Sequence, residues 1–265
     1  MDGSMKISVV ERSSRICELL KDNKQVSIVQ LAQMFDVSEM TVHRDLRKLE
    51  EDGRIRRTRG GAIPAERMEF EFDFALRRRA RQKEKQAIAE ETLKLIEPGQ
   101  RIILDAGTTT LEVAYLLRDF QNITVITPSL AVGSVLQFSA GIETVLLGGI
   151  IRHGSPDLTG VVTETNLDMF AVDIAFQGAD GIGLDGTLYT DDMRIVKVDQ
   201  KIQKRAAKSY ILADSSKIGK TALATNGYVY QVNALITDNA IDPECKKAFE
   251  EMGATVIVAG NSKKK

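Results

Sequence analysis

The chain has 265 residues, of which 43% are hydrophobic and 28% charged, and its formal net charge is −1. This length predicts about two domains, and no apolar run approaches the ~20 residues of a membrane span. A membrane protein and a disordered chain are therefore excluded. The two cysteines lie at opposite ends of the chain and the two histidines lack ligand spacing, which argues against a disulfide framework and a zinc finger. With no apolar core of a secretory signal at its start, the sequence predicts a cytoplasmic protein that needs no metal and no cofactor.

The charge is distributed unevenly along the chain. Residues 1–63 carry 12 basic and 10 acidic side chains, whereas the remainder carries 24 basic and 27 acidic ones. A basic head on an acidic body favours a polyanionic partner for the head, although a difference this small is a weak indication by itself.

Three short helices are expected in the head. Apolar residues at helical spacing behind a polar start at residues 13–14 predict a first helix of about ten residues. Ser27 is expected to cap a second helix, and Ser38 a third that runs to Asp52 before Gly53 stops it. Helices this close in sequence must share one core.

The third helix has two different faces. Val42, Leu46 and Leu49 fall on one stripe, which is expected to face the core. The opposite side is polar and predicts contacts with DNA, because a helix fits the major groove, Arg recognises a guanine edge and Lys neutralises phosphates. The candidate DNA-binding residues of this segment are Ser38, Met40, Thr41, His43, Arg44, Arg47 and Lys48.

A basic β-hairpin is expected after the third helix. Basic and apolar residues alternate there, and two glycines at 60–61 supply the turn. Its candidate DNA-binding residues are Arg54, Arg56, Arg57 and Arg59. A charged helical face is often merely solvated, but two capped helices and a basic hairpin in this order are typical of a winged helix-turn-helix. We therefore expect residues 1–63 to form a DNA-binding domain whose partner is double-stranded DNA.

The sequence VSEMTVHRDLRKLE at residues 37–50, followed by RGGA at 59–62, resembles the head of the DeoR family of bacterial transcription regulators. Members of that family usually carry Arg where this chain has His43. No base preference is therefore carried over from the family.

Residues 64–85 are expected to connect the head to the body. Phenylalanines alternate with acidic residues at 69–74, which indicates either a short strand or an interface edge. The basic run at 77–85 either contacts DNA phosphates or forms the solvated start of a helix that reaches Ile96.

The body, residues 86–265, is predicted to be an α/β domain. Short runs rich in Ile, Val and Leu alternate with helical patterns, and their lack of strict alternation indicates strands buried on both faces. We therefore expect a mostly parallel sheet flanked by helices, with ligands at the carboxyl ends of the strands. The expected strands are residues 101–105, 123–127, 143–147, 173–178, 210–214, 234–238 and 255–259.

Polar residues and glycines follow the first four strands, where they are expected to form one pocket. After the first strand, a helix begins at three threonines, and the unpaired amides of its first turn suit a phosphate. The alternative is that Thr108 only caps that helix, and Lys197 on a later helix either reaches the pocket or faces solvent. The candidate effector-binding residues are Asp105, Gly107, Thr108, Thr109, Thr110, Ser129, Gly148, Gly149, Arg152, Gly178, Asp180 and Lys197.

Four motifs at these strand ends extend the resemblance to the C-terminal sensor of DeoR-type regulators, namely DAGTT at 105–109, LGG at 147–149 with Arg152, GADG at 178–181 and LADSSK at 212–217. The resemblance implies a fold similar to ribose-5-phosphate isomerase, a phosphorylated sugar as effector, and repression as the usual mode. Two residues depart from the family pattern: Pro128 stands where members commonly have Asn, and Met193 where many have Glu.

We therefore expect a sequence-specific transcription regulator, a repressor of a carbohydrate-metabolism operon, that acts as a homodimer or homotetramer. A phosphorylated sugar would bias its heads between DNA-competent and DNA-incompetent arrangements. The alternative is a sugar-phosphate isomerase with Asp180 as base and Lys197 as electrostatic partner. The sequence after Asp180 lacks the Lys-Gly-rich stretch and following Glu that the isomerase resemblance would require, so no enzyme activity is expected. A purely structural protein would leave the basic hairpin and the strand ends unexplained.

Overall fold

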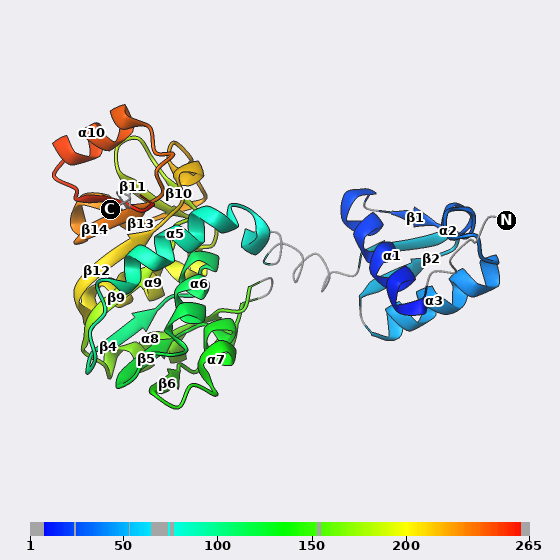
Figure 1. Ribbon diagram of the computed structural model, residues 1–265, viewed down its shortest axis with the longest axis horizontal. Coiled ribbons are helices and arrows are strands. Elements are labelled where there is room, and N and C mark those ends of the chain that lie inside the picture. Colours follow the sequence, from blue (N-terminus) through cyan, green and yellow to red (C-terminus); the bar gives the residue numbers. More distant parts are fainter. Residues whose placement is uncertain are drawn as a thin grey trace, which may run out of the picture. The chain divides into compact units, whose positions relative to one another are not determined.

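The computed structural model of the protein describes residues 8–23, 25–52, 54–64, 74, 77–152 and 155–260. The chain divides into two compact units, one before Arg77 and the other formed by Arg77–Arg152 and Pro156–Lys265 (Figure 1). Each unit has hydrophobic clusters of its own. Among the described residues, no helix is long and apolar enough to cross a bilayer.

The first unit packs three helices against a small sheet. The helices are α1 (Val9–Asn23), α2 (Ile28–Phe35) and α3 (Glu39–Glu51). The strands are β1 (Val26–Ser27), β2 (Ile55–Thr58) and β3 (Gly61–Pro64), which pair antiparallel in the order β1-β3-β2. Ile16, Leu31 and Leu46, one from each helix, are buried in the shared core. This arrangement is a winged helix-turn-helix.

The predicted caps of α2 and α3 are confirmed. The Ser27 hydroxyl accepts a hydrogen bond from the Gln30 amide at 3.1 Å, and the Ser38 hydroxyl accepts one from the Thr41 amide at 3.2 Å. Asp36 ends α2 in the left-handed conformation, with φ of 49°. Short polar side chains therefore fix both ends of the turn between the two helices.

The predicted start of α1 is wrong, because the helix begins at Val9 and not at Ser13. The Ser8 hydroxyl accepts a hydrogen bond from the Glu11 amide at 3.2 Å and so caps the first turn of α1. Arg12 lies on the core-facing stripe, and its Nε donates to Asp45 Oδ2 at 2.5 Å with both side chains buried. The first turn of α1 was missed because the hydrophobic pattern requires an apolar residue where this helix has the buried Arg12.

The predicted hairpin is present as β2 and β3, joined by Arg59 and Gly60. A Cβ at Gly61 would lie only 1.8 Å from the Val26 carbonyl oxygen, so the close approach of β1 to β3 requires glycine here. Gly53, the predicted stop of α3, lies outside the described residues. The same holds for the predicted alternation at residues 69–74, of which only position 74 is described.

The second unit is built on a seven-stranded sheet in the order β15-β14-β12-β9-β4-β5-β6. All seven predicted strands are present, and every pairing between them is parallel. Their bounds are β4 (Arg101–Leu104), β5 (Ile123–Thr127), β6 (Ile142–Leu146), β9 (Val172–Gln177), β12 (Ala206–Leu212), β14 (Ala234–Thr237) and β15 (Val256–Val258). Only the start of β12 differs much from the prediction, because its first three residues, Ala206, Ala207 and Lys208, are not buried.

Helices flank this sheet in two groups. One group is α5 (Gln82–Leu93), α6 (Thr108–Leu117) and α7 (Leu130–Leu136), which pack side by side, and the other is α8 (Val161–Asp168) with α9 (Met193–Arg205) (Figure 1). A further helix, α10 (Pro243–Glu251), precedes β15. The expected helix to Ile96 ends earlier, at Leu93, because the amides of Leu95 and Ile96 bond to carbonyls three residues back at 3.0 and 3.1 Å.

The strand order places a topological switch point between β4 and β9. The chain runs from β4 outward through β5 to β6, and then returns to β9 on the other side of β4. In sheets of this kind ligands bind outside the carboxyl ends of the strands, at the point where the order reverses. The loops that follow β4 and β9 therefore mark the expected site.

Two small additions, which the sequence did not predict, arise at the same edge of the sheet. The hairpin β7 (Ile150–Ile151) and β8 (Leu158–Thr159) follows β6. The antiparallel sheet of β10 (Gly181–Ile182), β11 (Thr187–Thr190) and β13 (Ala224–Tyr228) begins directly after β9. The strands β7, β8 and β10 have only two residues each, which is below the length at which alternation can be recognised. Both additions border the switch point.

Candidate functional site

The polar side of α3 presents basic side chains to solvent. Arg44, Arg47 and Lys48 are exposed, while Leu46 on the other side is fully buried. Within the described part of the chain, none of these three cations forms an ion pair. A surface hollow on this side is lined by Met40, Thr41, His43, Arg44 and Arg47. Uncompensated positive charge on an exposed helix face is what contact with a polyanion requires.

Ser38 and Thr41 have a different role from the cations. Their hydroxyl oxygens lie 2.9 Å apart, and Ser38 also caps α3. Both side chains thus fix the N-terminal turn of the helix that carries the basic face. His43 is half-buried beside the same hollow.

The hairpin adds a second basic surface. Arg54, Arg56 and Arg59 are exposed, whereas Arg57 is half-buried. The Arg57 amide donates to Glu50 Oε1 at 2.8 Å, and its guanidinium lies 3.9 Å from Glu50 Oε2. Arg57 therefore ties the hairpin to α3, and the other three cations remain open to a partner.

At the switch point, the loops after β4 and β9 are in direct contact. The Gly178 amide donates to Asp105 Oδ2 at 3.2 Å, and a Cβ on Gly178 would lie 3.7 Å from the Gly107 Cα. Thr110 is buried and its hydroxyl donates to the carbonyl oxygens of Asp105 and Gly107 at 2.7 and 2.8 Å. Gly107 is the N-cap of α6, so Thr108 is the first helical residue and does not cap the helix.

The ends of β5 and β6 mainly hold neighbouring helices in place. Ser129 is buried and its hydroxyl caps α7 at 3.2 Å from the Val132 amide. A Cβ on Gly149, whose φ is 153°, would lie 2.0 Å from the Thr163 hydroxyl, and that hydroxyl donates to the Gly148 carbonyl at 2.7 Å. The two glycines thus let α8 pack closely against this loop.

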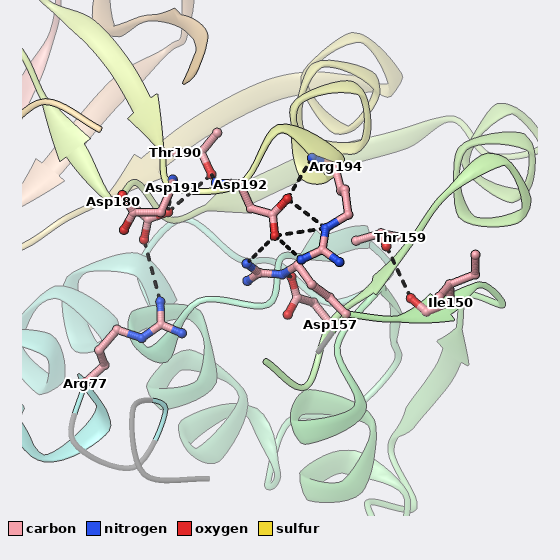
Figure 2. A network of polar contacts seen from close by, with 10 residues as sticks. Arg77, Ile150, Asp157, Thr159, Asp180, Thr190, Asp191, Asp192 and Arg194 are labelled. Atoms are coloured by element: carbon pink, nitrogen blue, oxygen red, sulfur yellow. Dashed lines mark hydrogen bonds and ion pairs between the residues drawn. The ribbon is translucent and has the colours of Figure 1, made fainter. Parts of the chain in front are cut away.

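Arg152 forms the centre of a network at the end of β7. Figure 2 labels three residues of this network, Asp157, Asp192 and Arg194. Its Nε donates to Asp157 Oδ2 at 2.7 Å and its Nη1 to Asp192 Oδ2 at 3.3 Å. Arg194 also donates to Asp192, through Nε at 2.9 Å, and hydrogen bonds from its guanidinium hold the pKa of Asp192 well below its usual range. The sequence did not single out Asp157 or Asp192 as residues of the site.

Asp180, in the loop after β9, is held from two directions (Figure 2). Its Oδ2 accepts hydrogen bonds from the Thr190 hydroxyl at 3.2 Å and the Asp191 amide at 3.0 Å. Its Oδ1 lies 3.7 Å from Nη1 of Arg77. Arg77 belongs to the basic run that the sequence left outside the candidate site.

Carboxylates crowd this edge of the sheet. Burial raises the pKa of Asp105 to about 6, with the negative charges of Asp157 and Asp180 acting in the same direction. Burial also raises the pKa of Asp199 well above its ordinary value, and the charge of Asp105 adds to that shift. A bound anion would add to this negative charge, so it needs a nearby cation that offsets the repulsion from the carboxylates.

Lys197 does not join this cluster. It is exposed on α9, and across the described ranges no hydrogen bond or ion pair links it to the strand-end loops. Asp199, two residues further on, is buried instead, and its Oδ2 accepts a hydrogen bond from Asn226 Nδ2 at 2.6 Å. The sequence missed Asp199, although its spacing from the core-facing Ile202 could have placed it on the inner side of α9.

Both units match the two domains of one protein family. Residues 12–67 match the DeoR-like helix-turn-helix domain, and residues 80–239 match the DeoR C terminal sensor domain. The chain belongs to the DeoR family of transcriptional regulators. In this DeoR-family protein, α3 and the hairpin lie within the first match and the switch-point loops within the second, whereas Arg77 lies between them.

Curated relatives are similar over nearly their whole length and are named as regulators. The transcriptional regulator GolR of Listeria innocua is 32% identical over 94% of this chain and 98% of its own. The regulator YulB of Bacillus subtilis is 31% identical over 97% and 99%, and the glycerol-3-phosphate regulon repressor of Escherichia coli is 30% identical over 86% and 90%. The DeoR-family chain is accordingly a DNA-binding transcription regulator.

Among solved structures, two ribose-5-phosphate isomerases resemble part of the chain. One, in complex with phospho-erythronic acid, is 22% identical over 52% of this chain and 54% of its own, with a TM-score of 0.39. The other, from Methanocaldococcus jannaschii, is 21% identical over 52% and 55%, also with a TM-score of 0.39. A likeness this low carries no conclusion about the activity of the DeoR-family protein.

Proposed function

We propose that the protein represses a carbohydrate-metabolism operon and that a phosphorylated sugar, bound at the carboxyl ends of β4 and β9, modulates its DNA binding. The observation that carries this proposal is the contact between the glycine-containing loops at the switch point, beside the N-terminus of α6. The names of two relatives, the glycerol-3-phosphate regulon repressor and a putative aga operon repressor, support the choice of operon.

On the DNA side, α3 would enter the major groove. Arg44 and Arg47 would reach base edges or phosphates, with His43 and Thr41 beside them, and the exposed arginines of the hairpin would contact the backbone. Because these cations have no partner within the described residues, they can bind DNA without first breaking an ion pair.

On the effector side, the first-turn amides of α6 would hold the phosphate, since they have no acceptor within the helix. Carboxylates would accept hydrogen bonds from the sugar hydroxyls. Asp180 offers Oδ1, and Asp157 offers a buried Oδ1 that has no hydrogen-bond partner in the described structure. Arg152 would fix the orientation of Asp157 through its 2.7 Å hydrogen bond.

We further propose that the protein is a homo-oligomer, as a two-fold operator requires. The hairpin β7–β8 and the start of α8 expose four apolar side chains, and the side chain of Ile150 lies against Gly160 at the start of α8. We call this surface the β7–α8 patch, and its members are Ile150, Ile151, Val161 and Val162. Contiguous apolar surface of this kind is typical of subunit contacts.

An isomerase activity is not proposed. A general base needs a partner that stabilises the developing negative charge, and the lysine considered for that role, Lys197, is exposed and not linked to Asp180. Incubation of the purified protein with sugar phosphates, followed by product analysis, tests this directly; turnover would revive the alternative.

The proposed function is tested by fluorescence anisotropy of the purified protein on labelled DNA from upstream of its own gene. The assay contains excess random DNA and is repeated with a panel of sugar phosphates that includes glycerol 3-phosphate. We expect binding that resists the competitor and that one sugar phosphate shifts. Competitor-resistant binding that no member of the panel shifts would contradict the effector half of the proposal.

A further inference from the structure

Two arginines at the start of the second unit, Arg77 and Arg78, contact elements that border the proposed effector site. Arg77 lies 3.7 Å from Asp180 in the loop after β9 (Figure 2). Arg78 lies 3.9 Å from Glu112 and stacks on Tyr115, with 4.9 Å from its guanidinium carbon to the ring centroid. Glu112 and Tyr115 belong to α6, whose N-terminus borders the switch point. Two adjacent arginines thus contact the loop after β9 and the middle of α6, the helix that begins at the switch point.

The backbone of this segment is fixed by a buried lysine. Lys85 in α5 is only 4% exposed, and its ammonium donates to the carbonyl oxygens of Arg77 and Ala80, the latter at 2.6 Å. Because Lys85 anchors the backbone at Arg77, the side chain of Arg77 can change its contacts while its position in the chain stays fixed. That position directly follows the segment leading from the DNA-binding unit.

The contact between Arg77 and Asp180 is of a kind that exchanges easily. The Arg77 side chain is 42% exposed and that of Asp180 23%, whereas the Arg152 side chain is 15% exposed and lies between two carboxylates. Partly exposed pairs are held weakly. Asp180 also accepts hydrogen bonds from Thr190 and Asp191 that do not involve Arg77, so its loop has other contacts besides this pair.

An anion in this site needs a cation that is free to turn toward it. Arg152 is committed to Asp157 and Asp192, and Lys85 to backbone carbonyls. Arg77 has a single carboxylate partner among the described residues, at a distance longer than a hydrogen bond. A phosphate can accept two parallel hydrogen bonds from the planar guanidinium of Arg77. The present contact with Asp180, at 3.7 Å, does not supply them.

We propose that Arg77 is an effector-binding residue that exchanges Asp180 for the phosphate of the bound sugar, and that this exchange couples the site to the DNA-binding unit. The proposal rests on the proposed function, because it assumes an anionic effector at the switch point. It adds a residue that lies between the two family-matched segments.

The first test measures binding of the sugar phosphate that shifts the wild-type protein, by calorimetry on the full chain. Arg77→Gln is expected to weaken binding at least tenfold, and Arg77→Lys to give an intermediate value. Arg79→Gln is the matched control, because it makes the same charge change at an exposed residue two positions away. It is expected to stay within twofold of wild type. Equal affinities for Arg77→Gln and Arg79→Gln would overturn the proposal.

The coupling is tested separately, at saturating effector. For each variant, the DNA affinity with effector is divided by its own affinity without effector. Arg77→Gln is expected to bring this ratio at least threefold closer to 1 than in wild type, even when the site is filled. A full wild-type ratio in this variant would overturn the claim that the exchange transmits the signal.

The exchange itself is tested with inorganic phosphate in a phosphate-free starting buffer. Asp180→Asn removes the competitor for Arg77, so phosphate is expected to bind this variant severalfold more tightly than wild type. The gain is expected to vanish in the double variant with Arg77→Gln, and a gain that persists there would refute the exchange. If no sugar phosphate shifts DNA binding by wild type, the proposed function fails, while this cycle still decides whether Arg77 binds the anion.

Discussion

The basic face of the first unit and the strand-end site of the second treat charge in opposite ways. Arg44, Arg47 and Lys48 on α3 have no ionic partner within the described residues. At the strand ends, Arg152 and Arg77 are each already paired with carboxylates. The first surface is therefore ready for a polyanion, whereas a ligand of the second site must replace existing contacts. A site that must rearrange in order to bind is suited to transmit a signal.

The largest expected effect comes from Arg152→Ala, which removes one of the paired cations of the strand-end site. It leaves the buried Asp157 and the neighbouring Asp192 without their shared cation. We expect thermal unfolding to show a loss of about 3–4 kcal/mol in stability, toward the low end of the range for buried pairs. The effector response should be blunted while DNA affinity without effector is kept. An unchanged melting temperature together with an unchanged response would show that the network is not part of the site.

Arg44→Ala removes one of the unpaired cations of the basic face of α3. Removing one arginine from a base or phosphate contact should cost about 1–3 kcal/mol of specific DNA binding, measured by competitor-resistant anisotropy. Effector binding by calorimetry should remain. Arg15→Ala, in an exposed pair on α1, is the matched control and should leave DNA binding unchanged. Loss of both DNA and effector binding in Arg44→Ala would indicate misfolding and would remove the support for the assignment.

Asp105→Asn tests how the crowded carboxylates affect stability. Because burial raises the pKa of Asp105 to about 6 in the folded protein, the folded state binds more protons than the unfolded state between about pH 4 and 6. Its stability contribution is therefore lost as pH rises through this range. We expect the variant to be more stable than wild type by roughly 1–2 kcal/mol at pH 7.5, with a smaller gain at pH 5. Asp119→Asn, at an exposed residue, should show no gain at either pH.

The smallest expected effect is that of Arg56→Gln on the hairpin. An exposed arginine that contacts a phosphate contributes about one unit to the slope of log affinity against log salt concentration. Affinity should fall to a similar degree on specific and random DNA. Arg57→Gln is the informative comparison, because Arg57 is tied to Glu50 and should change DNA binding mainly through the position of the hairpin. A change of specificity in Arg56→Gln would show that this residue reads bases instead.

Features that depend on neighbouring residues could be predicted from the sequence. The caps Ser27 and Ser38 and all seven strands of the main sheet rest on local patterns, and the structure confirms them. The start of α1 was missed because the buried Arg12 finds its partner, Asp45, 33 residues away. The strand-end loops were found because they follow buried strands directly.

The sequence named Arg152 and Asp180 but not their partners Asp192 and Arg77, because these contacts join distant parts of the chain. Arg152 and Asp192 are separated by 40 residues, and no periodicity relates Arg77 to Asp180. The hairpin β7–β8, which places Asp157 next to Arg152, is built from strands of two residues each. For Lys197 the sequence left open whether the side chain reaches the pocket or faces solvent, and the structure places it in solvent.

The central claim is that the strand-end site and the DNA-binding unit are coupled, and thermodynamic linkage provides its most direct test. Effector affinity should be measured by calorimetry for the free protein and for the protein saturated with operator DNA. The account predicts that DNA changes effector affinity by the same factor by which effector changes DNA affinity. An effector that binds free and DNA-bound protein equally well would contradict it.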